Sequence, residues 1–196
     1  LAEVLQEWQG LGYNRRAKYL HEAAKMIAAH GEPTTQEGLV RLPGVGPNTA
    51  AAIMNYAYNV PVPFVETNIR TVYFHFFFQD KSAVSDAEIL EQVANTISHD
   101  DPREWFWALM DYGSYLKSQG QGRLDVSSHY VRQSPFKGSV RQVRGQIIKA
   151  LSADDLPLDA LQRAVGADNR FTTALNGLVK DGLIQVTNDR YHLTKR

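Results

Sequence analysis

One nine-residue stretch constrains the fold of this chain more than any other: Leu42 to Ala50, with the sequence LPGVGPNTA. Gly44 and Gly46 permit backbone angles and close approaches that a Cβ would forbid. Pro43 ends an incoming helix, and Pro47 suits the first turn of the next one. The stretch therefore predicts two short helices joined by a tight hairpin.

Such a hairpin leaves backbone N–H groups without helical partners. Those of Gly44, Gly46 and the following turn point outward beside the positive end of a helix dipole, which suits a phosphodiester. Hairpins of this kind often hold a monovalent cation through their carbonyls, here those of Leu42 and Val45. A plain helix–turn–helix corner is the alternative interpretation. The apolar helix predicted at 49–58 favours the phosphate site.

A second segment, Val65 to Arg70, follows about twenty residues later and opens a helix with a carboxylate. Glu66 lies at the start of this very apolar helix. Its charge has two interpretations, as a partner for the helix dipole or as a group that acts on a bound substrate. Arg70, one turn further on, is either a phosphate contact or a solvated charge.

Composition excludes several chemistries. The chain has 196 residues and no cysteine, so it can form no disulfide and supply no thiolate nucleophile or cysteine-ligated metal or cluster. No signal peptide or run of about 18 apolar residues is present. The densest apolar run, Tyr73 to Phe78, is too short to span a bilayer, and we expect it to form the buried centre of its domain. We therefore expect a cytoplasmic protein with no membrane contact and no metal site.

The net charge of zero conceals a basic segment. Between Gly120 and Lys149 the only acidic residue is Asp125. The basic residues of this segment are Arg123, Arg132, Lys137, Arg141, Arg144 and Lys149. It indicates either a local anionic partner or a solvated linker, and charge alone leaves both open.

Periodicity predicts a mainly helical protein. The expected helices are 1–11, 13–30, 35–42, 49–58, 67–78, 85–97 and 102–116, then 140–151, 158–165 and 169–180. Two strands, 183–186 and 191–193, flank a turn at Asn188-Asp189. Three helices followed by a β-hairpin are typical of a winged helix. We expect a first domain over 1–117, a basic linker over 118–138 and a winged-helix-like α+β unit over 139–196.

Several ordered motifs resemble the helix–hairpin–helix DNA glycosylase superfamily, the relatives of endonuclease III. The hairpin and the helix after it match in order and spacing. Within the superfamily the resemblance is closest to the branch that removes adenine mispaired with 8-oxoguanine. Residues 10–24, GLGYNRRAKYLHEAA, resemble that branch's GLGYxxRAxxLHxAA, and residues 109–113, LMDYG, resemble its MMDLG. The resemblance covers residues 1 to about 113 and implies an all-α glycosylase domain there.

The resemblance implies a mechanism and assigns its residues. Family members flip a nucleotide out of the duplex and cleave its N-glycosidic bond. A carboxylate at the position of Glu66 stabilises the oxocarbenium-like state, although the family normally has Asp there. Asn48 occupies the place where bifunctional relatives carry a Schiff-base lysine; an amide cannot be that nucleophile, so monofunctional base removal is expected. Asn68 matches the family Asn that orients the carboxylate or the sugar.

The resemblance also implies the partner, double-stranded DNA that contains a mispaired or damaged base, bound by a monomer near the nucleoid. The expected DNA contacts are Leu42, Gly44, Val45, Gly46, Asn48, Thr49, Arg70, Tyr13, Arg141 and Arg144. No cofactor is expected apart from the hairpin cation, because the family's iron–sulfur loop would follow Gly113 and residues 114–121 have no cysteine.

The resemblance begins where the family's domain is already well advanced. We therefore expect the family's general acid, and the residue that fills the gap left by the flipped base, to lie outside these residues. Two further hypotheses remain open. One is a thymine or uracil mismatch glycosylase. The other is a non-catalytic DNA-binding protein that uses the hairpin and the winged helix.

Overall fold

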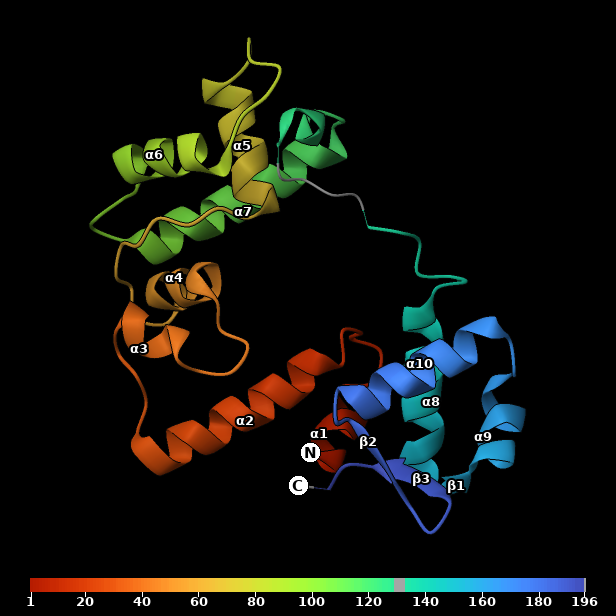
Figure 1. The fold of residues 1–196 in the computed structure, drawn as a ribbon. Helices are drawn as coiled ribbons and strands as arrows, with labels where there is room; N and C mark the ends of the chain where they lie inside the picture. Colours follow the sequence, from red (N-terminus) through yellow and green to blue (C-terminus); the bar gives the residue numbers. More distant parts are fainter. Residues whose placement is uncertain (129–132, 196) are drawn as a thin grey trace. The chain divides into compact units, whose positions relative to one another are not determined.

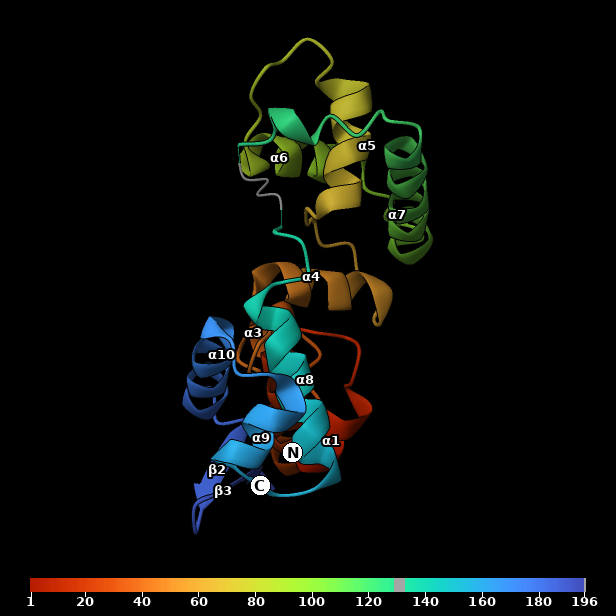
Figure 2. The ribbon, with the colours of Figure 1, turned by 90° about the vertical axis from the view of Figure 1, so that its right-hand side faces the viewer.

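The computed structural model describes residues 1–128 and 133–195, and the chain divides into two compact units (Figures 1 and 2). One unit is Glu32–Arg132, which we call the hairpin unit. The other combines Leu1–Gly31 with Gln133–Arg196, and we call it the winged unit.

The hairpin unit is built from α-helices, each of which matches a predicted helix within two residues at either end. They are α3 (Gln36–Val40), α4 (Pro47–Tyr56), α5 (Thr67–Phe77), α6 (Asp86–Thr96) and α7 (Pro102–Ser118), followed by the short 3₁₀ helix η1 (Leu124–Val126). Local signals account for their starts: Ser85 forms a capping box with Glu88 at α6, and Asp101 caps α7.

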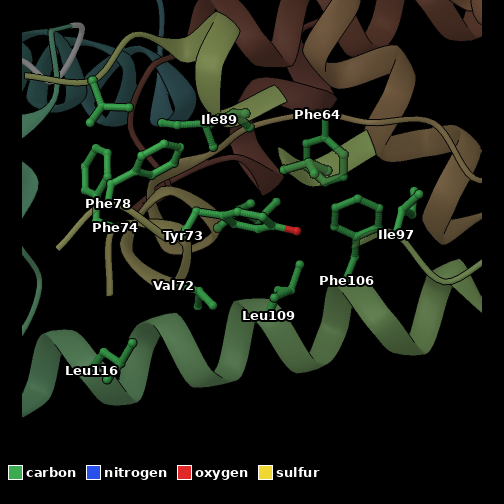
Figure 3. Packing of buried hydrophobic residues seen from close by; sticks show 14 of the residues in the cluster. Phe64, Val72, Tyr73, Phe74, Phe78, Ile89, Ile97, Phe106, Leu109 and Leu116 are labelled. Carbon is green, nitrogen blue, oxygen red and sulfur yellow. The ribbon is translucent and has the colours of Figure 1, made fainter. Parts of the chain in front are cut away.

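The core of this unit lies between α5, α6 and α7. Figure 3 shows Tyr73 of α5 above Leu109 of α7, with Phe64 close to Phe106. The ring centroids of Phe64 and Phe106 are 4.6 Å apart. Gly113 lets α7 approach the start of α5, because a Cβ there would overlap the backbone carbonyl of Asn68. The carboxylate helix is thus held directly against α7.

The aromatic run at the end of α5 is only partly buried. Tyr73, Phe74 and Phe78 are core residues, as expected, whereas Phe76 is 55% exposed and Phe77 49% exposed. The run thus forms the buried centre of the unit only in part, because consecutive residues of a helix point about 100° apart and cannot all face one core.

Part of the expected linker 118–138 packs against the hairpin unit. Arg123 donates to the carbonyls of Phe78 and Lys81 at 3.0 and 3.2 Å. The N–H of Val84 donates to the Val126 carbonyl at 3.0 Å, and Val126 is buried. Arg132, one of the basic residues counted in the sequence, lies outside the described residues.

The winged unit contains both ends of the chain. Its elements are α1 (Ala2–Glu7), α2 (Arg15–His30), α8 (Val140–Ala153), β1 (Leu156–Pro157), α9 (Leu158–Val165), α10 (Asn169–Lys180), β2 (Ile184–Thr187) and β3 (Arg190–Leu193). The antiparallel sheet has the strand order β1-β3-β2. Asn188 and Asp189 both have positive φ, as a two-residue type I′ hairpin requires. Strand β1 was not predicted, since two residues are too few to show a period.

This division differs from the expected boundary at residue 117, because the first 31 residues pack with the winged helix. Leu5 of α1 and Ala17 of α2 lie in one buried cluster with Ile147 of α8 and Leu178 of α10. The Lys18 ammonium also donates to the Asp181 carbonyl at 2.9 Å. Burial of these apolar side chains, which are distant in sequence, accounts for the association.

No helix in the described part of the chain is both long enough and apolar enough to cross a membrane.

Candidate active site and DNA interface

The hairpin turn forms as the sequence predicts. Gly44 has φ of 76°, a conformation that favours glycine, and the N–H of Val45 donates to the Leu42 carbonyl at 3.1 Å. Gly46 has an extended backbone, and a Cβ built there would meet nothing within 4 Å. The fold therefore does not require a glycine at position 46, and the space beside its Cα is open to an external group.

Helix α4 begins in a way that leaves its N-terminus available. Its N-cap is Gly46, which has no side chain, and Pro47 occupies the first turn. In the same unit α3, α5, α6 and α7 all begin with a side-chain cap. The N–H groups of Asn48 and Thr49, both exposed residues, thus have neither a helical acceptor nor a cap. These N–H groups are therefore available to an external hydrogen-bond acceptor.

Glu66 is the N-cap of α5 and is partly buried. Its Oε1 accepts from the backbone N–H of Asn68 at 2.6 Å and from that of Ile69 at 3.2 Å. These bonds hold the carboxylate at the positive end of the helix dipole. In the described part of the chain Oε2 accepts no hydrogen bond. One oxygen therefore fixes the carboxylate while the other remains free to face a substrate.

Tyr56, at the end of α4, is a site neighbour that sequence reasoning missed. Burial raises the pKa of its phenol, and the negative charge of Glu66 raises it further. The phenol oxygen is buried without a hydrogen-bond partner among the described residues, and Trp107 stacks on the ring at 6.4 Å. Tyr56 thus keeps its proton beside Glu66. No sequence signal marks it, because it lies among apolar residues of a buried helix.

The structure also locates the two asparagines of the predicted site. The amide nitrogen of Asn48 donates to the Val65 carbonyl, and its Oδ1 accepts from the Val65 N–H at 3.5 Å. Asn68 donates to the sulfur of Met110 at 3.9 Å, and its Oδ1 is buried without a partner among the described residues. Asn48 is therefore bonded to the residue before Glu66, whereas Asn68 is bonded to Glu66 through its own backbone N–H.

The environment of Arg70 does not match its predicted role as a DNA contact. Its side chain is only 10% exposed and donates through Nε and Nη2 to the carboxylate of Asp86, at distances of 2.7 to 3.1 Å. The guanidinium is used to fasten α5 to the start of α6. We therefore assign Arg70 to the structure of the unit instead of to the DNA interface.

In the winged unit, two guanidinium groups lie over the ring of Tyr13. The Cζ atoms of Arg16 and Arg141 are 5.3 and 5.5 Å from the centroid of its ring. Arg141 donates to the Tyr13 hydroxyl at 2.8 Å, and this hydroxyl donates to Oε1 of Gln133 at 2.7 Å. Tyr13 has φ of 47°, and its side chain is held by cation–π contacts in an exposed position.

Beside this ring is a basic hollow of about 450 Å³, which we call the arginine cradle. It is lined by Tyr13, Asn14, Arg15, Arg16, Tyr19, Arg141, Arg144 and Asp181. Asp181 pairs with Arg144 at 2.6 Å and with Arg15 at 3.9 Å, so Arg144 has the closer partner within the cradle. Arg15, 63% exposed, and Arg16 were not among the predicted DNA contacts; their position within the motif of residues 10–24, close to Tyr13, is the signal that could have identified them.

The ligand atoms that the chain can offer determine which cofactors it could hold. The iron–sulfur cluster implied by the resemblance does not fit, because the sequence has no thiolate to ligate it. Among the described residues no three His, Asp or Glu side chains gather as a metal site. The Leu42 carbonyl accepts one hydrogen bond in the hairpin and keeps a second lone pair, so the hairpin carbonyls are compatible with a hard cation.

Comparison with known proteins is consistent with this geometry. Residues 1–97 match the HhH-GPD superfamily of base excision DNA repair proteins. An adenine DNA glycosylase of Mycolicibacterium smegmatis is 32% identical over 210 residues, which covers 96% of this chain and 72% of that protein. An adenine DNA glycosylase of Mycobacterium tuberculosis is 33% identical over 213 residues, covering 96% and 70%. One from Arabidopsis thaliana is 33% identical over 119 residues, covering 58% and 19%. The chain therefore belongs to the HhH-GPD superfamily of base excision DNA repair proteins.

Proposed function

We propose that this chain is a monofunctional glycosylase that removes adenine paired with 8-oxoguanine or G in double-stranded DNA, and that it acts as a monomer. One observation carries the proposal: the hairpin unit holds both a helix N-terminus suited to phosphate and a capped carboxylate, Glu66. Asn48 connects the two. The choice of adenine rests on the names of the relatives.

In the proposed reaction the target nucleotide leaves the duplex stack and presents its C1′ to Glu66. The C1′–N bond breaks, and the base leaves with the bonding electrons and takes up a proton. Water then adds to C1′ and gives up a proton, so that the products are the free base and an abasic site. The Glu66 carboxylate stabilises the positive charge that develops on the sugar, an effect typically worth 10²–10³ in rate for one well-placed group.

The proposal excludes lyase chemistry at Asn48. A Schiff base requires an amine, and the amide of Asn48 is both non-nucleophilic and hydrogen-bonded to Val65. Asn68 would orient the sugar or the carboxylate. Strand cleavage should therefore occur only after alkali breaks the abasic site.

The DNA footprint is proposed to include both units. In the hairpin unit it comprises Leu42, Gly44, Val45, Gly46, Asn48 and Thr49, with a monovalent cation on the carbonyls of Leu42 and Val45. In the winged unit it comprises the arginine cradle, whose four arginines outnumber its one carboxylate. We place the protein in the cytoplasm, associated with the nucleoid.

The decisive experiment is a single-turnover assay on four duplexes, with A opposite 8-oxoguanine, A opposite G, T opposite G, and U opposite G. We expect base release from the first two, visible as strand breaks only after alkali. Preferential release of T or U would instead indicate a mismatch glycosylase. Duplex binding without release from any substrate would indicate the non-catalytic DNA-binding protein.

The same preparation tests the proposal that no cluster is needed. We expect purified active protein to contain neither iron nor acid-labile sulfide. Base release that depends on bound iron would contradict this.

A further inference from the structure

Two asparagines of α4, Asn48 and Asn55, each form a pair of hydrogen bonds with one residue of the extended segment that leads to Glu66. Asn55 donates to the Val62 carbonyl at 2.7 Å and accepts from the Val62 N–H at 3.4 Å. Asn48 donates to the Val65 carbonyl and accepts from the Val65 N–H at 3.5 Å. Each side-chain amide thus pairs with the backbone as a peptide group of a neighbouring strand would.

The segment needs such partners because it cannot obtain them from a sheet. Pro61 and Pro63 have no N–H to donate. No strand in the described part of the chain pairs with residues 60–65. Unpaired polar groups of a buried backbone would be costly, and Val65 is only 4% exposed. The two amides satisfy the N–H and C=O groups of Val62 and Val65.

The distance between the two asparagines along α4 matches the distance between their two valine partners along the segment. Asn48 and Asn55 are seven residues apart on α4, which corresponds to a rise of about 10.5 Å. Val62 and Val65 are three residues apart in extended chain, a span of about 10 Å. The two runs are antiparallel, since Asn48 pairs with Val65 and Asn55 with Val62. The helix and the segment can therefore be joined at both points without strain.

The two hydrogen bonds between Asn48 and Val65, which we call the near pair, join the start of α4 to the residue before Glu66. Those between Asn55 and Val62 are the remote pair. Asn48 lies in the first turn of α4, beside the N–H groups of the phosphate site. Val65 directly precedes Glu66, so the Cα atom of the carboxylate residue is only 3.8 Å from that of the clamped one. A shift of either element would then carry the other with it.

We propose that Asn48 and Asn55 form an amide clamp in which Asn48 is a positioning residue for Glu66. The clamp sets the distance between the gripped phosphate and the carboxylate. Asn48 acts through Val65 and does not need to touch the substrate. Asn55, fully buried and also bonded to the Ala51 carbonyl at 2.8 Å, anchors the remote end of the segment. The inference rests on the proposed catalytic role of Glu66.

The test compares three alanine variants of the full chain. Asn48→Ala removes the near pair, Asn55→Ala removes the remote pair, and Asn95→Ala, at an exposed position of α6, is the matched control. For each we would measure the single-turnover rate at saturating protein, the Kd for a duplex with an uncleavable abasic analogue, and the thermal unfolding midpoint.

Asn48→Ala is expected to lower the rate about 10- to 100-fold, because a misplacement of about 1 Å can cost 100-fold. Its Kd should change less than about threefold, since the backbone N–H groups of the phosphate site remain. Asn55→Ala should lower the unfolding midpoint at least as much but the rate clearly less. Asn95→Ala should change neither. A rate for Asn48→Ala within about threefold of the native rate would overturn the proposal, as would equal rate losses at positions 48 and 55.

Two further measurements keep the test decisive. If Asn48→Ala does not fold, the isosteric Asn48→Asp, which keeps the acceptor and loses the donor, replaces it with the same expected rate loss. Amide hydrogen exchange tests the clamp without any activity: exchange at Val65 should accelerate in the Asn48 variant, and exchange at Val62 in the Asn55 variant. Unchanged exchange at both valines would refute the clamp itself. A native chain that releases no base would instead refute the proposed function.

Discussion

At the scale of single residues, the position of Glu66 follows from an unusual cap. Helices prefer Ser, Thr, Asp or Asn at the N-cap, whereas here a glutamate bends back so that Oε1 accepts from the N–H groups of Asn68 and Ile69. Capping and the proposed catalytic role are compatible in this arrangement because they use different oxygens.

The Glu66→Gln variant separates charge from shape. Its amide oxygen can still cap α5, but it cannot stabilise a cation by charge. We expect the single-turnover rate to fall at least about 100-fold while the Kd for duplex DNA stays within about threefold. Glu66→Asp, which keeps the charge and the cap, serves as the control and should retain more activity than Glu66→Gln. A Glu66→Gln variant with full rate would show that the residue is only a cap.

At the scale of elements, close helix packing and helix caps determine where the site residues lie. Gly113 brings α7 against the start of α5, and Arg70 fastens α5 to α6 through Asp86. The capping box of Ser85 and Glu88 then fixes where α6 begins. The helix that carries Glu66 is thus held from both sides.

Gly113→Ala tests the approach of α5 and α7. The added Cβ would meet backbone atoms of Asn68, which cannot move aside as a flexible side chain would. We expect the free energy of unfolding, measured by urea denaturation, to fall by about 2 kcal/mol, the overpacking cost less the helix propensity gained. Gly145→Ala in α8 is the control, because nothing lies within 4 Å of its Cβ, and it should stabilise by up to about 1 kcal/mol. Equal effects at the two positions would contradict this account of the packing.

The capping box should make stability depend on pH. A hydrogen bond from Lys81, followed by those from Ser85, lowers the pKa of Glu88 from 4.5 to about 2. A carboxylate with a lowered pKa in the folded state contributes stability above its unfolded pKa and loses it as pH falls through the folded value. The unfolding midpoint of the native chain should therefore exceed that of Glu88→Gln above pH 4.5, and the difference should shrink between pH 4.5 and 2. A difference that does not change with pH would show that the box contributes no charge effect.

At the scale of the whole molecule, the net charge is zero but basic side chains are concentrated in one place. The arginine cradle of the winged unit gathers four arginines around one carboxylate. Arg144 pairs closely with Asp181, at 2.6 Å, whereas Arg15, which is 3.9 Å from the same carboxylate, and Arg16 are exposed. The winged unit can therefore contribute to DNA affinity even though the formal net charge is zero.

The salt dependence of duplex binding tests this contribution. Each phosphate contact adds about 0.9 to the slope of log K against log salt concentration. We expect Arg15→Ala and Arg16→Ala each to reduce the slope by about that amount, and Arg144→Ala to lower stability with little change in slope. Lys25→Ala is the control, because Lys25 lies nine residues further along α2, about 14 Å from Arg16. Unchanged slopes for both arginine variants would remove the cradle from the DNA interface.

The sequence by itself determined the features that depend on neighbouring residues. The hairpin turn, the capping box and the wing turn at Asn188-Asp189 follow from glycine, proline and short polar side chains, whose conformational preferences act over a few residues. The position of Glu66 at a helix start is of the same kind.

Only the tertiary structure decided which distant groups meet. Tyr13 and Arg141 bond across 128 positions of the sequence, Arg70 is buried against Asp86, and Asn55 clamps Val62. A periodic pattern states which face of a helix is apolar but not which other face covers it. Partner choice depends on the packing of the whole unit, and this is why the arginine cradle and the amide clamp emerge only from the folded chain.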